Sequence, residues 1–122
     1  MTANFSVSTA SNAEVPAEAE FISMSIMISN YGSEVSWEIA SLDDTVVCEG
    51  GRNAGTNYAS WTEYEVTDCE LAGGDYVLNC IDSYGDGWHG AAVTINGVDY
   101  CGEFLSGTGE DPGRLWTEEF SL

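Results

Sequence analysis

The feature that most constrains this fold is a run of short segments in which apolar and polar residues alternate. Between Phe21 and Ser29, isoleucine and methionine occupy every second position, with serine at most positions between them. This period of two places the apolar side chains on one face of a β-strand. The same pattern predicts strands at 35–41, 45–49, 61–67, 75–81, 91–95, 98–104 and 114–122.

No segment has a 3.6-residue period long enough for a helix, and Gly, Asn and Asp mark the turns between segments. Asn96-Gly97 is the strongest of these hairpin signals. The sequence therefore predicts an all-β fold, an antiparallel β-sandwich of jelly-roll or immunoglobulin-like topology. Trp37, Trp61 and Trp116 fall at periodic strand positions, so we expect them in the core.

Four cysteines, Cys48, Cys69, Cys80 and Cys101, lie in a small chain without lysine. Their even number favours two disulfides and an oxidising, extracellular environment, and their wide spacing argues against zinc. If 61–67 and 75–81 form a hairpin, Cys69 and Cys80 lie at opposite ends of it and cannot bond. We therefore expect Cys80–Cys101 and Cys48–Cys69, with the first bond joining neighbouring strands.

Residues 1–20 differ from the rest of the chain. Residues 2–9 alternate like a strand, with Phe5 and Val7 on one face, and 10–20 read as an acidic linker. We therefore divide the chain into an N-terminal strand arm with its linker, 1–20, and a β-sandwich domain, 21–122.

The chain has 21 acidic residues, two arginines and a net charge of −19. Such a charge argues against binding nucleic acid or anionic membranes, and no stretch is long enough for membrane insertion. Apolar residues make up 43% of the chain, which favours a packed fold over disorder. We expect a secreted protein whose leader lies outside this numbering.

The segment from Cys80 to Gly90 concentrates the unusual residues of the chain. Asp82 and Asp86, followed by Gly87, match part of the spacing of a calcium loop, but Val93 stands where an EF-hand needs its bidentate Glu. A β-loop calcium site completed by backbone carbonyls and a carboxylate from elsewhere remains open. The alternative is a turn whose carboxylates accept their own backbone N–H groups.

The sequence contains none of the recognisable catalytic motifs: it has no nucleophile motif, no phosphate-binding glycine loop and no lysine. We expect no enzymatic activity, and we expect His89 to be a solvated loop residue. Tyr84 and Trp88 are the candidates for binding a glycan, because aromatic rings stack on sugars. For Trp88, closing over its own loop is the alternative role.

The motif Asp82-Ser-Tyr-Gly-Asp-Gly-Trp88, entered from a strand containing Cys80, resembles a motif of small secreted β-domains from aquatic microbes. The resemblance covers roughly 35–101. It implies an extracellular protein, and some domains of this kind are associated with extracellular fibrils.

Two functions follow as hypotheses. In the first, the chain is the structural protomer of an extracellular helical filament, in which Phe5 and Val7 of one copy insert into the sheet edge of the next. The arm could instead pair with its own domain or remain free. In the second, the chain is a calcium-dependent carbohydrate-binding or adhesive module.

Overall fold

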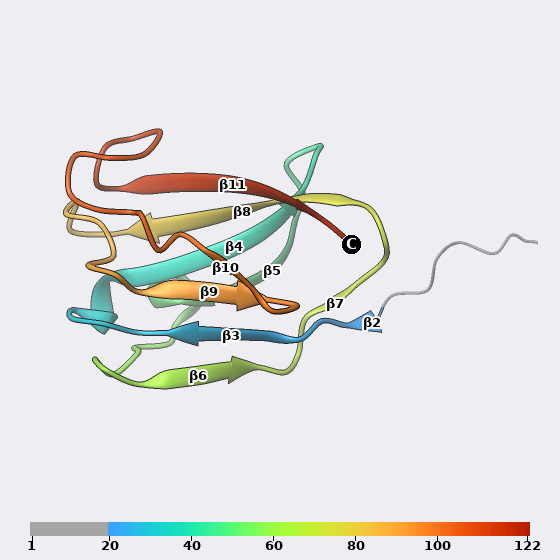
Figure 1. The fold of residues 1–122 in the computed structure, drawn as a ribbon, viewed down its shortest axis with the longest axis horizontal. Coiled ribbons are helices and arrows are strands. Elements are labelled where there is room, and N and C mark those ends of the chain that lie inside the picture. The colour runs from blue at the N-terminus through green and yellow to red at the C-terminus, as the bar shows by residue number, and fades with distance from the viewer. Residues whose placement is uncertain (1–19) are drawn as a thin grey trace, which may run out of the picture.

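In a computed structural model, which describes residues 20–122, the chain forms two antiparallel four-stranded sheets packed face to face (Figure 1). The first sheet has the order β10 (Val98–Tyr100), β9 (Ala92–Ile95), β3 (Met24–Met27), β6 (Glu63–Val66). The second has the order β11 (Leu115–Ser121), β8 (Asp75–Asp82), β4 (Val35–Ser41), β5 (Val46–Gly51). A short pair, β2 (Glu20–Phe21) and β7 (Glu70–Leu71), lies at one end, and the 3-10 turns are η1 (Gly32–Glu34) and η2 (Arg52–Ala54). The predicted β-sandwich is confirmed.

The core lies between the two sheets and takes its side chains from alternate strand positions. Ile26 of the first sheet and Ile39 and Leu78 of the second are completely buried. Trp37 is also buried, as predicted, and its indole N–H donates to the Tyr58 hydroxyl at 3.0 Å. The buried tryptophan therefore has a partner for its polar atom.

Both disulfides pair as predicted, Cys48–Cys69 and Cys80–Cys101. The predicted hairpin of 61–67 and 75–81 is wrong, because β6 and β8 belong to different sheets. Cys80 lies in β8 and Cys101 directly follows β10, so this bond also joins the two sheets rather than neighbouring strands. The other bond joins Cys48 of β5 to Cys69, which lies just before β7, so each disulfide links the second sheet to another part of the fold.

Three predicted strands are shorter in the structure, each for a local reason. The 21–29 strand is interrupted at Ser23, whose backbone N–H and C=O both bond to Asn96 of the β9–β10 hairpin. The 98–104 strand ends at Tyr100 because Cys101 has a left-handed φ of 68°.

The third is the 61–67 strand, which begins only at Glu63 because Trp61 has a left-handed φ of 59°. Trp61 is 70% exposed, so its predicted place in the core is wrong. Trp116 is half-buried and packs against the core.

The sandwich has two distinct ends (Figure 1). One, the loop end, holds η1 and the loop that follows β8; the other, the β2 end, holds β2, β7 and the C-terminus. Residues 1–19 therefore join the domain at the β2 end. The predicted arm, including Phe5 and Val7, lies outside the described residues.

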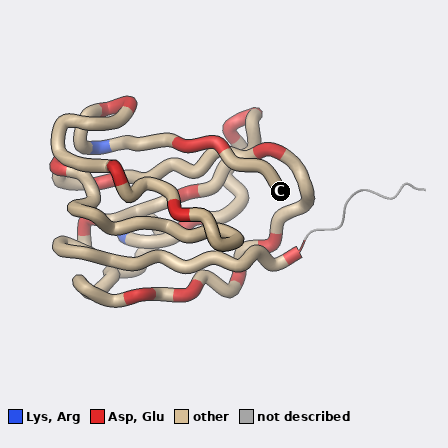
Figure 2. Tube along the Cα trace, in the orientation of Figure 1, with Lys and Arg blue, Asp and Glu red and all other residues tan. Residues whose placement is uncertain are grey.

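Acidic residues are spread over both sheets and their turns, whereas the two arginines lie toward the loop end (Figure 2). Within residues 20–122, no helix has the length and apolar character needed to span a membrane.

Candidate metal centre

The loop end brings together two segments that are far apart in the sequence. Val35, the first residue of β4, pairs with Asp82, the last residue of β8. One step further along, the Ser83 N–H donates to the Glu34 carbonyl at 3.0 Å. This register places Glu34, at the end of η1, beside the start of the loop.

Three carboxylates meet at this point: Glu34, Asp82 and Asp86 each offer an oxygen, and these oxygens all lie within 4.8 Å of one another. Asp82 is only 1% exposed, although it carries a charged group. Its Oδ1, together with Oε1 of Glu34 and Oδ1 of Asp86, is buried and has no hydrogen-bond partner among the described residues. Buried polar atoms are normally paired, so this cluster lacks a compensating group.

The other oxygen of Asp82 holds the loop in shape. Oδ2 accepts the backbone N–H groups of Gly85 at 2.9 Å and of Asp86 at 2.6 Å. The turn interpretation of the sequence is therefore correct for Oδ2, but it leaves Oδ1 unexplained. One carboxylate therefore closes the turn with one oxygen, while its second oxygen is buried without a partner in a residue that borders Glu34 and Asp86.

His89 is not the freely solvated residue that we expected. Its Nε2 lies 3.1 Å from Oδ2 of Asp86, and the side chain is 31% exposed. The imidazole therefore borders the three carboxylates, on the side of Asp86.

The carboxylates alter each other's protonation. Burial, followed by the charges of Asp82 and Asp86, raises the pKa of Glu34. Burial, followed by the closeness of the Asp86 carboxyl group, raises the pKa of Asp82. At Asp86 burial is opposed by the neighbouring Asp82 carboxyl group and by His89, which together lower its pKa. In the absence of a cation, the cluster therefore holds a proton on Asp82 longer than an isolated aspartate would.

The arrangement can hold a metal ion. Carboxylate oxygens are hard donors that suit Ca²⁺, Mg²⁺ or Mn²⁺, and a divalent cation would supply the positive charge that the three acidic groups lack. Thiolate sites are excluded for the described cysteines, because all four are in disulfides.

Close backbone packing fixes the loop that carries Asp86. Gly87 has a φ of 80°, and a Cβ at this position would lie 2.6 Å from the Leu105 carbonyl carbon. The Gly87 N–H donates to the Gly113 carbonyl at 2.9 Å. The glycine is therefore required both for its left-handed conformation and for the closeness of 104–105.

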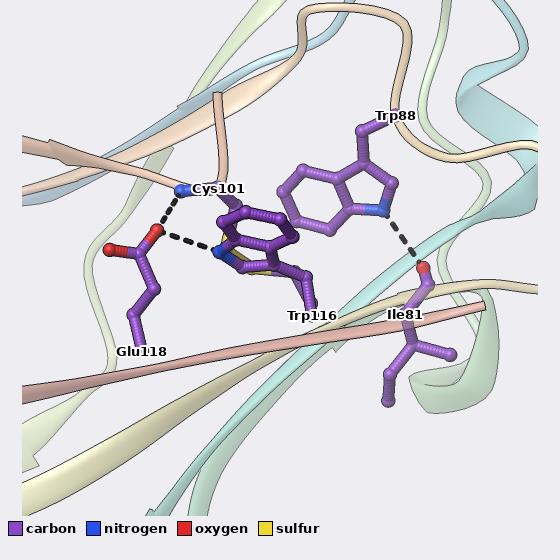
Figure 3. Close-up of a disulfide and its surroundings, with 6 residues drawn as sticks. Ile81, Trp88, Cys101, Trp116 and Glu118 are labelled. Carbon is purple, nitrogen blue, oxygen red and sulfur yellow. Dashed lines mark hydrogen bonds between the residues drawn. A yellow bond between two sulfur atoms is a disulfide. The ribbon is translucent and has the colours of Figure 1, made fainter. Parts of the chain in front are cut away.

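The side chain of Trp88 packs beneath its own loop, the one between β8 and β9 (Figure 3). The side chain is completely buried, and its indole N–H donates to the Ile81 carbonyl at 2.9 Å. In the same region the Glu118 carboxylate accepts the Cys101 backbone N–H at 2.7 Å and the Trp116 indole N–H at 3.0 Å. Of the two residues predicted to bind a glycan, Trp88 has no free ring face, whereas Tyr84 is 71% exposed.

Sequence reasoning identified Asp82 and Asp86 but not Glu34. The only signal for Glu34 was its place after the turn Asn30–Ser33, immediately before the strand that pairs with β8. Without knowing that 35–41 and 75–82 are neighbours, no spacing rule joins it to the loop.

Comparison with protein-family models, with curated proteins and with solved structures found no match for this chain.

Proposed function

We propose that this chain is a calcium-stabilised structural domain of the extracellular space, without enzymatic activity, that acts as the protomer of a helical filament. The observation that carries the calcium part is the unpartnered, buried Oδ1 of Asp82 among three carboxylates. Calcium suits the site because it accepts an irregular set of oxygen ligands, including waters and backbone carbonyls. Two disulfides support an oxidising environment.

Assembly in this proposal uses residues 2–9 as a strand donated to the next copy. Within the described residues, β5, β6, β10 and β11 each pair on one side only, so their outer edges are open to a further strand. Residues 1–19 join the domain at the β2 end, away from the metal centre, which suits a head-to-tail arrangement. A contact of this kind does not close on itself and extends into a fibre.

Deleting residues 1–12 tests the role of the arm. We expect long filaments of the full chain in negative-stain images, and folded monomers after the deletion. The double variant Phe5→Ser/Val7→Ser should behave like the deletion, whereas Asn4→Ala/Ser6→Ala, on the other face of the predicted strand, should still assemble. Filaments that persist after the deletion would refute strand donation.

A second candidate function, calcium-dependent carbohydrate binding, is favoured by one observation. Tyr84 is 71% exposed within the loop that the cation would fix. In this case the protein should bind a glycan array in calcium but not in chelator, and Tyr84→Ala should remove the binding without lowering stability. Binding that survives Tyr84→Ala, or an array without signal, would contradict this function.

A further inference from the structure

One edge of the second sheet has no partner strand. β5 pairs with β4 alone among the strands of residues 20–122. Its last residue is covered, because the Thr56 N–H donates to the Gly51 carbonyl at 2.9 Å. Residues 46–49 instead line a groove of about 240 Å³, together with Asp68. This groove leaves the first four residues of β5 open to a further strand.

The open part of β5 carries apolar side chains. The pairing of β4 with β5 shifts between Ile39 and Ala40, so that Val46 pairs with Ala40 and Val47 has no partner in β4. Val46 and Val47 are therefore both exposed, 43% and 44%, although they are consecutive. Charged side chains, lysine above all, normally protect such an edge, and this chain has no lysine. The exposed valines indicate an edge that a further strand covers.

The other three edges are charged, short or covered. β6 has exposed Glu63 and Glu65 among its four residues. β10 is only three residues long. The start of β11 is covered, because the Glu110 N–H donates to the Leu115 carbonyl at 2.8 Å, and Glu119 further along is exposed. Of the four edges in the described sheets, only β5 combines an open stretch of four residues with two exposed valines.

Residues 2–9 have the composition that suits this edge. They contain no charged residue, and Phe5 and Val7 share one face of the predicted strand. A strand without carboxylates avoids repulsion by Glu49 and Asp68, which both line the groove. Its apolar face can cover the two exposed valines. An acidic strand, in contrast, would bring like charges together.

The position of the groove also suits a donated arm. Ser41, at the end of β4, pairs with Tyr76, and Tyr76 pairs with Phe120 near the C-terminus. The turn that leads into β5 therefore lies at the β2 end, where residues 1–19 join the domain (Figure 1). Residues 10–19 of the linker can span up to roughly 35 Å when extended. This length is enough for the arm of one copy to reach the β5 edge of a neighbour.

We infer that residues 2–9 of one copy pair with residues 46–49 of β5 in the next copy, with Phe5 and Val7 packed against the exposed valines. This inference rests on the proposed filament and names the edge that receives the donated strand. Main-chain hydrogen bonds to β5 supply the affinity, and the apolar side chains set the register. Donor and acceptor are different parts of the chain, so the contact repeats from copy to copy.

The test measures assembly of the full chain in calcium by sedimentation velocity and negative-stain imaging. Val46→Glu/Val47→Glu should weaken association by roughly tenfold or more, because charged side chains on an edge oppose strand addition. Its control is Met27→Glu/Val98→Glu, which adds the same charge at exposed apolar residues of β3 and β10 and should still assemble. Thermal melts check that both variants are folded.

Hydrogen exchange locates the contact without a substitution in β5. In filaments of the wild-type chain, residues 46–49 should exchange more slowly than in the unassembled Phe5→Ser/Val7→Ser variant. Residues 63–66 of β6 should exchange at the same rate in both samples.

Mixing two full-length variants separates donor from acceptor. Val46→Glu/Val47→Glu keeps its arm and Phe5→Ser/Val7→Ser keeps its edge, so neither alone should form filaments and the mixture should form 1:1 complexes. Filaments that are lost in Phe5→Ser/Val7→Ser but unchanged in Val46→Glu/Val47→Glu would overturn this inference and leave the proposed function standing. Equal losses in the control variant, or protection of β6 in place of β5, would also overturn it. A monomeric full chain with residues 46–49 protected would mean that the arm pairs with its own domain, and would overturn both the inference and the proposed filament.

Discussion

Glu34, at the end of η1, and Asp82, at the end of β8, bring carboxylate oxygens within 4.8 Å of each other. Each of the two carboxylates also has one buried oxygen, Oε1 of Glu34 and Oδ1 of Asp82, without a hydrogen-bond partner among the described residues. Two acidic groups in this position repel each other unless a proton or a cation lies between them. The behaviour of the loop end should therefore depend on pH and on divalent ions.

The first prediction concerns pH without calcium. Because the pKa values of Glu34 and Asp82 are raised above their ordinary values of 4.5 and 3.8, the folded state binds more protons than the unfolded state just above those values. Stability from this pair should therefore fall as pH rises through that window toward neutrality. Thermal melts in chelator should show the fall, and Asp82→Asn should reduce it.

With calcium bound, stability should change with pH in the opposite direction. The cation replaces the proton, so its stabilising effect grows as pH rises and the carboxylates ionise. If melts with calcium and with chelator have the same pH dependence, the cluster does not exchange protons for a cation.

A pair of substitutions at Asp82 should separate its two roles. Asp82→Asn keeps an oxygen for the N–H groups of Gly85 and Asp86 and removes one charge from the cluster, so at neutral pH the apo protein should be at least as stable as the wild type but should not respond to calcium. Asp82→Ala leaves those N–H groups unpaired and should lower the free energy of unfolding by about 1–3 kcal/mol. Urea unfolding measures both effects, and equal losses in the two variants would refute the division of roles.

The tryptophans give a matched comparison. Trp88→Ala removes a completely buried side chain and its bond to the Ile81 carbonyl, so we expect a loss of about 3–5 kcal/mol. Trp61→Ala removes a mostly exposed side chain and should change stability by less than about 0.5 kcal/mol. Chemical unfolding followed by circular dichroism checks this, and comparable losses would contradict the burial of the two residues described here.

The disulfides should differ in accessibility more than in strength. Both close loops with a sequence separation of 21, so each should contribute about 2–4 kcal/mol. Cys48 is partly exposed, whereas Cys80 and Cys101 are buried. Under native conditions a mild reductant should open Cys48–Cys69 first, as detected by alkylation and mass spectrometry. Simultaneous opening of both bonds would mean that reduction proceeds through global unfolding.

Much of the fold could be predicted from the sequence because strands leave a local signal. Strand alternation, as at Met24 and Ile26, and the hairpin turn at Asn96-Gly97 are set by residues that are neighbours in the sequence, so a short segment is enough to predict them. The predicted cysteine pairing is confirmed, although the hairpin of 61–67 and 75–81 from which the strand heights were taken is wrong. Sheet order depends on contacts between distant segments, so the placement of β6 and β8 in different sheets left no trace in the local pattern.

The candidate site likewise has a part that the local sequence could predict and a part that depends on contacts between distant segments. Asp82 and Asp86 are only four residues apart, so their spacing was enough to predict them as candidate metal ligands. Glu34 joins them only through the register of β4 against β8. Trp61 occupies a periodic position, but its backbone has a left-handed angle and its side chain is exposed. Tryptophan is not a residue type that indicates such an angle, so the sequence could not predict this exposure.

The most direct test of the metal centre is calorimetric titration of calcium into the chelator-treated full chain. We predict that one ion binds per chain and raises the melting temperature, and that Glu34→Gln and Asp82→Asn abolish both effects. Glu65→Gln, an exposed acidic residue on β6, should change neither. Absence of binding to the wild-type chain, or binding that survives both substitutions in the cluster, would contradict the account.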